Sequence, residues 1–221
     1  MNRPARLVTA VLTASAALLL TACGGGSDDS SSDDIKGADT GSSSPSDSTS
    51  ASPTATAAPG APDVSVPKDV NLVFDFDAPS DTKHAAALAS AENYIRALNH
   101  GIVKQDPNDP AYQYYSGNQA AQYAKSQIQA WVKGGWIPTG TDRFHNSDVT
   151  TLSGGKRVLV AFCENQAKFY SKEIKTGKIL YTEENLDSYL KYSLLMVPPS
   201  GSSQVWKAQV VEVKGKVEEC R

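Results

Sequence analysis

The apolar residues of this chain follow three patterns that succeed one another along the sequence. Residues 7–20 form an apolar run interrupted only by Thr9, Thr13 and Ser15. From residue 81 to residue 135 the apolar positions recur at helical spacing, and after Pro138 the period changes to two. Helical patterns followed by strand patterns predict an α+β fold in which helices pack on a sheet.

Two helices are predicted from the helical part. The first covers residues 81–103, because Ser80 or Asp81 can cap its start. The second ends at Gly134-Gly135, since glycine is the usual stop signal of a helix. Each has an apolar stripe: Leu88, Ala91, Ile95 and Leu98 in the first, and Ala121, Ala124, Ile128, Trp131 and Val132 in the second. The intervening loop contains a turn at Tyr112–Tyr115.

Four strands are predicted in the second half of the chain, over residues 144–152, 157–170, 189–197 and 205–213. In the longest, Val158, Val160 and Phe162 alternate with residues of the opposite face. The turn at residues 198–203 joins the last two strands as a hairpin, and residues 174–178 form another turn. We therefore expect a meander of about four antiparallel strands.

The N-terminal apolar run has the features of an export signal. It follows a segment with two positive charges, Arg3 and Arg6, and no acid. About 14 residues span only about 21 Å as a helix, whereas a bilayer core needs roughly 20 apolar residues. The run is therefore too short for a permanent transmembrane anchor.

The end of this run, Leu20-Thr21-Ala22-Cys23, resembles the lipobox of bacterial lipoproteins. The resemblance implies that residues 1–22 are a signal peptide, cut before Cys23, and that the Cys23 thiol carries a diacylglycerol. Two acyl chains anchor a protein stably where one is marginal. The resemblance places the protein at the cell membrane, lipid-anchored on the extracytoplasmic face. The alternative is an ordinary secretory signal with a chance cysteine.

Residues 23–66, which follow the signal peptide, have the composition of a linker. Ser, Thr, Asp, Gly, Pro and Ala dominate, no aromatic residue occurs, and seven aspartates stand against one lysine. Such a segment cannot bury enough apolar surface to offset its ordering entropy, so we expect it to be disordered. As a flexible coil of about 43 residues it reaches about 35–40 Å. It is either an inert spacer or an O-glycosylated stalk.

Residues 67–221 remain as one globular domain of ordinary size. Its 18 basic and 17 acidic residues nearly cancel, which argues against a nucleic-acid partner. The three histidines, at positions 84, 100 and 145, do not have the spacing of metal ligands, and no nucleotide or hydrolase motif occurs. The sequence therefore predicts no metal and no cofactor.

The order of helices and strands resembles the NTF2-like fold, in which a curved sheet wraps a long N-terminal helix and leaves a cone-shaped pocket. The resemblance covers roughly residues 82–213. The strand around Cys163, the Val205-Trp206-Lys207 strand and the terminal Glu219-Cys220-Arg221 also look like a group of uncharacterised Gram-positive lipoproteins thought to share that fold. A generic helix-on-sheet layer is the rival fold.

Cys163 and Cys220 are an even pair once Cys23 is lipidated. In an oxidising compartment a disulfide between them is the expected outcome. The alternative, a redox or nucleophilic thiol, has no support from a Cys-x-x-Cys motif or a neighbouring histidine.

NTF2-like enzymes place an Asp, Tyr or His inside the cone, which makes Tyr94, Tyr115, His145 and Asp148 the candidate pocket residues. In the alternative interpretation, the two tyrosines pack in the core, and His145 and Asp148 lie in a solvated loop. We predict no catalytic residue and expect a binding or accessory domain, with a small apolar ligand or an envelope protein as partner. An acid–base enzyme and a structural envelope protein are the other two classes.

Overall fold

The computed structural model describes residues 60–201 and 205–221. The predicted signal peptide, Cys23 and most of the predicted linker lie outside the described residues. Residues 60–66 are without helix or strand, and Ala61, Val64 and Val66 pack against the core. No helix within the described ranges is long and apolar enough to cross a bilayer.

Three α-helices occur in the described residues: α1 (Thr82–Lys104), α2 (Pro110–Tyr115) and α3 (Asn118–Gly134). The α1 helix begins where its cap predicts, since Asp81 accepts a hydrogen bond from the His84 N–H at 2.8 Å. The expected turn at 112–115 belongs instead to α2. Asp109 caps α2 through the Ala111 N–H and also meets His100 Nδ1 at 3.0 Å, which ties α2 to α1.

The sheet contains six strands in the order β1-β2-β3-β5-β6, with β4 paired to β3 beside this path. The strands are β1 (Val70–Asp75), β2 (Trp136–Thr151), β3 (Val158–Glu173), β4 (Ile179–Leu180), β5 (Tyr189–Val197) and β6 (Lys207–Gly215). All pairings are antiparallel except that of β1 with β2, which is parallel. Short 3-10 helices precede β5 (Leu186–Ser188) and close the chain (Glu218–Cys220).

The prediction of helices on a curved antiparallel sheet of about four strands, as in the NTF2-like fold, is wrong. The sheet is mixed, has six strands and dominates the domain. The first strand, β1, pairs Val70 with Gly140, so the partner that stabilises it is 70 residues away. The second strand, β2, begins at Trp136, well before the predicted residue 144. Long-range pairing of this kind leaves little local pattern.

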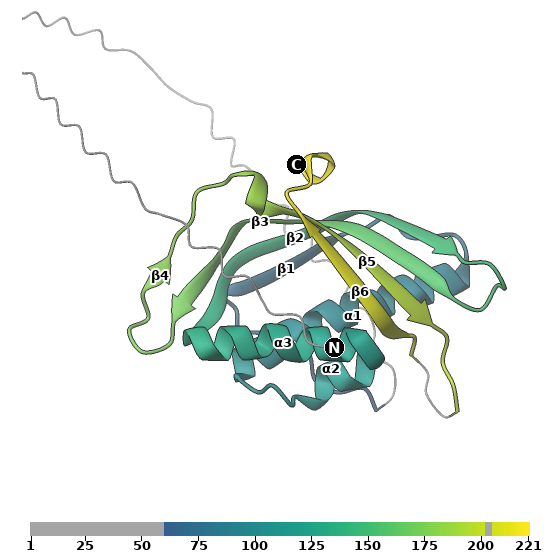
Figure 1. Cartoon of the computed structure of the whole chain (residues 1–221), viewed down its shortest axis with the longest axis horizontal. Coiled ribbons are helices and arrows are strands. Elements are labelled where there is room, and N and C mark those ends of the chain that lie inside the picture. Colours follow the sequence, from purple (N-terminus) through teal and green to yellow (C-terminus); the bar gives the residue numbers. More distant parts are fainter. Residues whose placement is uncertain (1–59, 202–204) are drawn as a thin grey trace, which may run out of the picture. The chain divides into compact units, whose positions relative to one another are not determined.

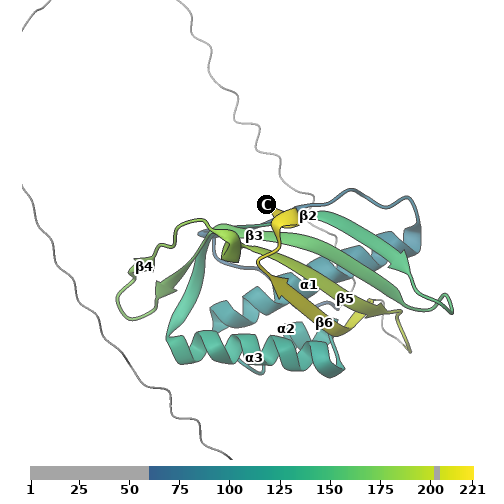
Figure 2. The same ribbon diagram turned by 45° about the horizontal axis from the view of Figure 1, so that its top comes forward.

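The core lies between the helices and one face of the sheet (Figures 1 and 2). Alternation along the strands directs aromatic side chains from four of them into this layer. Phe74 and Phe144 stack at 4.8 Å between ring centroids, and Phe162 and Tyr192 stack at 5.4 Å. These contacts join β1, β2, β3 and β5 into one packed face.

A second, smaller cluster lies on the other side of the strands, on the face to which Cys163 of β3 points. It consists of Cys163, Tyr189, Val217 and Cys220. Cys163 and Cys220 form a disulfide with a Cα–Cα distance of 5.2 Å. The bond holds the terminal 3-10 helix on the outer face of the sheet.

Candidate functional site

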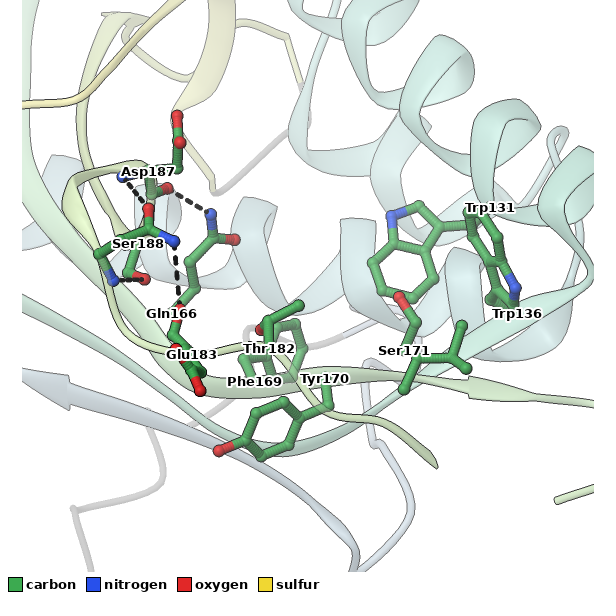
Figure 3. A pocket seen from close by; sticks show the side chains of 12 residues that line it. Trp131, Trp136, Gln166, Phe169, Tyr170, Ser171, Thr182, Glu183, Asp187 and Ser188 are labelled. Atoms are coloured by element: carbon green, nitrogen blue, oxygen red, sulfur yellow. Dashed lines mark hydrogen bonds between the residues drawn. The ribbon is translucent and has the colours of Figure 1, made fainter. Parts of the chain in front are cut away.

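The end of α3 creates one wall of the candidate site. Gly135 ends the helix in the left-handed conformation (φ 71°), and its N–H points to the carbonyls of Trp131 and Val132. A Cβ on Gly134 would lie 2.3 Å from the indole of Trp136, so only glycine lets this ring pack on the last helical turn. The chain reversal thereby brings Trp131 and Trp136 to the same wall (Figure 3).

The opposite wall is the irregular segment that follows β4. Asn185 forms a capping box with Ser188, in which each side chain bonds the other residue's backbone. Gln166 on β3 donates from Nε2 to the carbonyl of Asp187 at 3.1 Å, which fixes this segment to the sheet. A local cap and one long-range hydrogen bond therefore position the wall.

Between these walls lies a pocket of about 380 Å³, which we call the aromatic pocket. Phe169 and Tyr170 of β3 lie between the tryptophans and the capped segment (Figure 3). Its lining consists of Trp131, Trp136, Gln166, Phe169, Tyr170, Ser171, Leu180, Thr182, Glu183, Asn185, Asp187 and Ser188. An apolar interior with a few polar groups at its margin is typical of small-molecule sites.

The charged side chains of the aromatic pocket are acidic. Glu183 and Asp187 line it, and no lysine, arginine or histidine does. Asp187 is also paired with Lys216 at 3.2 Å, and both of these side chains are exposed. The pocket therefore favours a neutral or cationic ligand with an apolar face over an anion.

A pair of buried carboxyl groups lies elsewhere in the domain, on the core face of the sheet. Asp142 projects from β2 at a break in its register with β3, and Glu164 projects from β3. Asp142 Oδ1 and Glu164 Oε2 are buried without a hydrogen-bond partner in the described structure. Unpartnered buried oxygens are costly when charged, so the pair favours its protonated forms.

The surroundings of this pair shift its proton affinity strongly. Burial raises the pKa of Glu164 to about 7, while hydrogen bonding to Asp142 and Tyr192 opposes the rise. Burial, and then the nearby Glu164 charge, hold the pKa of Asp142 well above its ordinary value. Burial likewise raises the pKa values of Tyr192 and of Tyr123 on α3. The cluster is a set of proton-bearing groups enclosed by the core.

The predicted pocket residues do not come together in one site. Tyr94 and Tyr115 are buried core side chains, and the Tyr94 hydroxyl donates to the carbonyl of Ala120 at 2.8 Å. His145 pairs with Cys163 in the β2–β3 register and is half-buried, and Asp148 is exposed on β2. None of the four lines the aromatic pocket. In the described residues, no group of three or more His, Cys, Asp or Glu side chains has the arrangement of a metal site.

Sequence reasoning missed both the aromatic pocket and the buried carboxyl pair. The second carried a signal, because Glu164 continues the inward-facing series of Val158, Val160 and Phe162. An acid on the apolar face of a strand indicates a buried ionisable group. The aromatic pocket carried no signal, because its walls come from the end of α3, from β3 and from the segment between β4 and β5, which are distant in the sequence.

No family model matches the chain, and no curated protein is similar to it. Among solved structures, the intermembrane space region of the chloroplast protein ARC6 is similar at 12% identity. The match covers 57% of this chain and 95% of that one, with a TM-score of 0.34. The resemblance to Gram-positive lipoproteins stays a prediction from the sequence.

Proposed function

We propose that this protein is a lipid-anchored binding lipoprotein of the extracytoplasmic membrane face, and that the aromatic pocket is its ligand site. The observation that carries the proposal is the convergence of Trp131, Trp136 and Phe169 on one cavity with hydrogen-bonding groups at its margin. Aromatic rings bind apolar ligand faces, and the Gln166, Asn185 and Glu183 side chains would orient the ligand.

The anchor supports the same proposal from the sequence. A domain tethered through Cys23 by a flexible linker samples ligands close to the membrane, within about 35–40 Å of the anchor. A binding domain gains from such confinement because tethering raises its effective concentration near envelope material.

Titration with the neutral fluorophore N-phenyl-1-naphthylamine tests the pocket. The mature chain should enhance the probe's fluorescence, and Thr182→Trp, which fills the pocket from an exposed position, should weaken binding at least tenfold. Trp131→Ala should do the same. Thr150→Trp adds the same ring at an exposed position on β2 that does not line the pocket, so it serves as the control. Equal binding by the parent and Thr182→Trp would exclude this pocket.

An acid–base enzyme is the second candidate, and the Asp142–Glu164 pair favours it. A carboxyl group with a pKa of about 7 is suited to proton transfer at neutral pH. However, both side chains are enclosed by the core, and neither lines the aromatic pocket. Carbodiimide labelling of the native protein distinguishes the two candidates. Modification of Glu164 would reveal access for a substrate, and protection of Glu164 would argue for a purely structural pair.

A further inference from the structure

Three exposed large apolar side chains, Val132, Trp136 and Ile174, lie together at one end of the domain. Among the described residues, five large apolar residues are exposed: Val132, Trp136, Ile174, Tyr181 and Leu186. Val132, Trp136 and Ile174 line one hollow. Tyr181 follows β4, and Leu186 lies in the 3-10 helix before β5. Figures 1 and 2 show that β4 and the start of β2 lie at the same end of the sheet. Scattered single exposed residues are ordinary on protein surfaces, but a gathering of this kind marks an interaction site.

Two chain reversals form this surface, which we call the tip (Val132, Lys133, Trp136, Ile174 and Lys175). The N–H of Ile174 donates to the carbonyl of Gly135 at 3.0 Å, and Trp136 pairs with Glu173 in the sheet. The exposed fractions of Val132, Trp136 and Ile174 are 36%, 37% and 49%. A hollow of about 620 Å³ lies among the five tip residues. The backbone pairing holds it in a fixed shape.

The charge around the tip is basic. Lys133, Lys175 and the neighbouring Lys178 are exposed, and no ion pair engages them within residues 60–201 and 205–221. Glu173 is the acid that lines the hollow, and its carboxylate accepts a hydrogen bond from Thr176 at 2.6 Å. Three free ammonium groups beside a tryptophan and two aliphatic side chains match the interface of an anionic bilayer.

We infer that the tip docks onto an anionic lipid bilayer. Trp136 lies at the headgroup level, Ile174 and Val132 enter the acyl boundary, and the lysines meet lipid phosphates. The chain that precedes the described residues fits this partner, because a predicted linker reaching about 35–40 Å allows an anchored domain to turn its tip to the membrane. The inference goes beyond the ligand proposal and stands even if the aromatic pocket binds nothing.

Vesicle co-sedimentation tests the inference. The probe is the mature chain with Cys23→Ser, so that no acyl chain contributes, and vesicles of phosphatidylcholine with phosphatidylglycerol are compared with phosphatidylcholine alone. We expect stronger partitioning to the anionic vesicles. Each lysine near an anionic surface raises the membrane partition coefficient about fivefold. The double variant Lys133→Gln with Lys175→Gln should therefore lower partitioning at least tenfold. Lys156→Gln with Lys214→Gln, two exposed lysines away from the tip, is the matched control.

A second pair of variants tests the apolar contact. Trp136→Ser with Ile174→Ser should also lower partitioning at least tenfold, and lipids brominated on the acyl chain should quench the tryptophan fluorescence of the parent. Thermal unfolding checks that each variant is folded. If the apolar variant misfolds, the lysine variant, whose thermal unfolding should match that of the parent, still tests the inference. No binding by the parent, or equal binding by the tip variants, would overturn the inference. A parent that sediments as a dimer, with a monomeric Trp136→Ser/Ile174→Ser variant, would assign the tip to a second copy instead.

Discussion

Asp142 of β2 and Glu164 of β3 place two carboxyl groups next to each other on the core face of the sheet, and one oxygen of each is buried without a hydrogen-bond partner. Two adjacent carboxyl groups in a core cannot both ionise cheaply, because each charge is desolvated and repels the other. The pair therefore retains protons in the folded state that the unfolded chain would release.

The stability of the domain should fall as pH rises from about 4.5 to about 7. Burial raises the pKa of folded Glu164 to about 7 from its ordinary 4.5, so over this window the folded state binds more protons than the unfolded state. Stability then decreases with pH, by about 3 kcal/mol for this group, and Glu164 adds no further decline once it is ionised in the folded state. Urea unfolding at a series of pH values measures this slope.

Glu164→Gln isolates the contribution of the pair. The neutral amide cannot ionise, so the variant should show a shallower decline between pH 5 and pH 8 than the parent and be more stable than the parent at pH 8. The decline that remains belongs to Asp142, whose pKa burial still raises. The exposed Glu212→Gln should leave the slope unchanged. A parental slope in Glu164→Gln would show that other groups control the pH dependence.

Reduction of the Cys163–Cys220 bond should lower the free energy of unfolding by about 2–4 kcal/mol. The bond closes a loop with a sequence separation of 57 residues, and opening it frees the unfolded chain. The terminal 3-10 helix should detach, although the Val217 N–H still bonds the carbonyl of Tyr189 at 3.1 Å. Denaturant unfolding with and without reductant measures the loss, and Cys163→Ser with Cys220→Ser should match the reduced protein. Mass spectrometry that found both thiols free in envelope preparations would contradict the pairing.

Gly140→Ala should destabilise the domain by about 2 kcal/mol or more. Gly140 has a φ of 97°, and a Cβ there would lie 2.2 Å from the backbone carbonyl oxygen of Lys168 on β3. Both the backbone strain and the clash must be relieved by moving paired strands. Gly154→Ala is the matched control, since Gly154 also has positive φ (88°) but no atom lies within 4 Å of its Cβ position. Thermal unfolding should show a smaller loss for the control, and equal losses would disprove the clash.

Cys23→Ala should abolish stable membrane association of the precursor. The expected lipid at Cys23 is the proposed anchor, and tip contacts of the kind inferred above are reversible. Carbonate washing of membranes, followed by immunoblotting, distinguishes integral from released protein. A variant that stayed fully membrane-integrated after the wash would defeat the lipoprotein proposal.

Local chemistry in the sequence determined the elements whose signals lie close together. Asp81 as a cap and Gly134-Gly135 as a stop predicted α1 and the end of α3, and the period-two pattern predicted β3 and β5 nearly to their ends. These features depend on neighbouring residues, so a single sequence is sufficient to find them.

The tertiary structure alone decided the sheet and the sites. The parallel partner of β1 lies some 70 residues along the chain, and this pairing makes the sheet mixed. Trp136 and Glu183 line the same aromatic pocket because a chain reversal positions the first and a hydrogen bond from Gln166 to Asp187 fixes the segment that holds the second. Neither the reversal nor this hydrogen bond produces a periodic pattern in the sequence. The placement of Glu164 depends both on the local sequence and on the tertiary structure. Strand alternation directs its side chain inward, but only the fold places Asp142 beside it, because the pairing of β2 with β3 is a contact between distant residues.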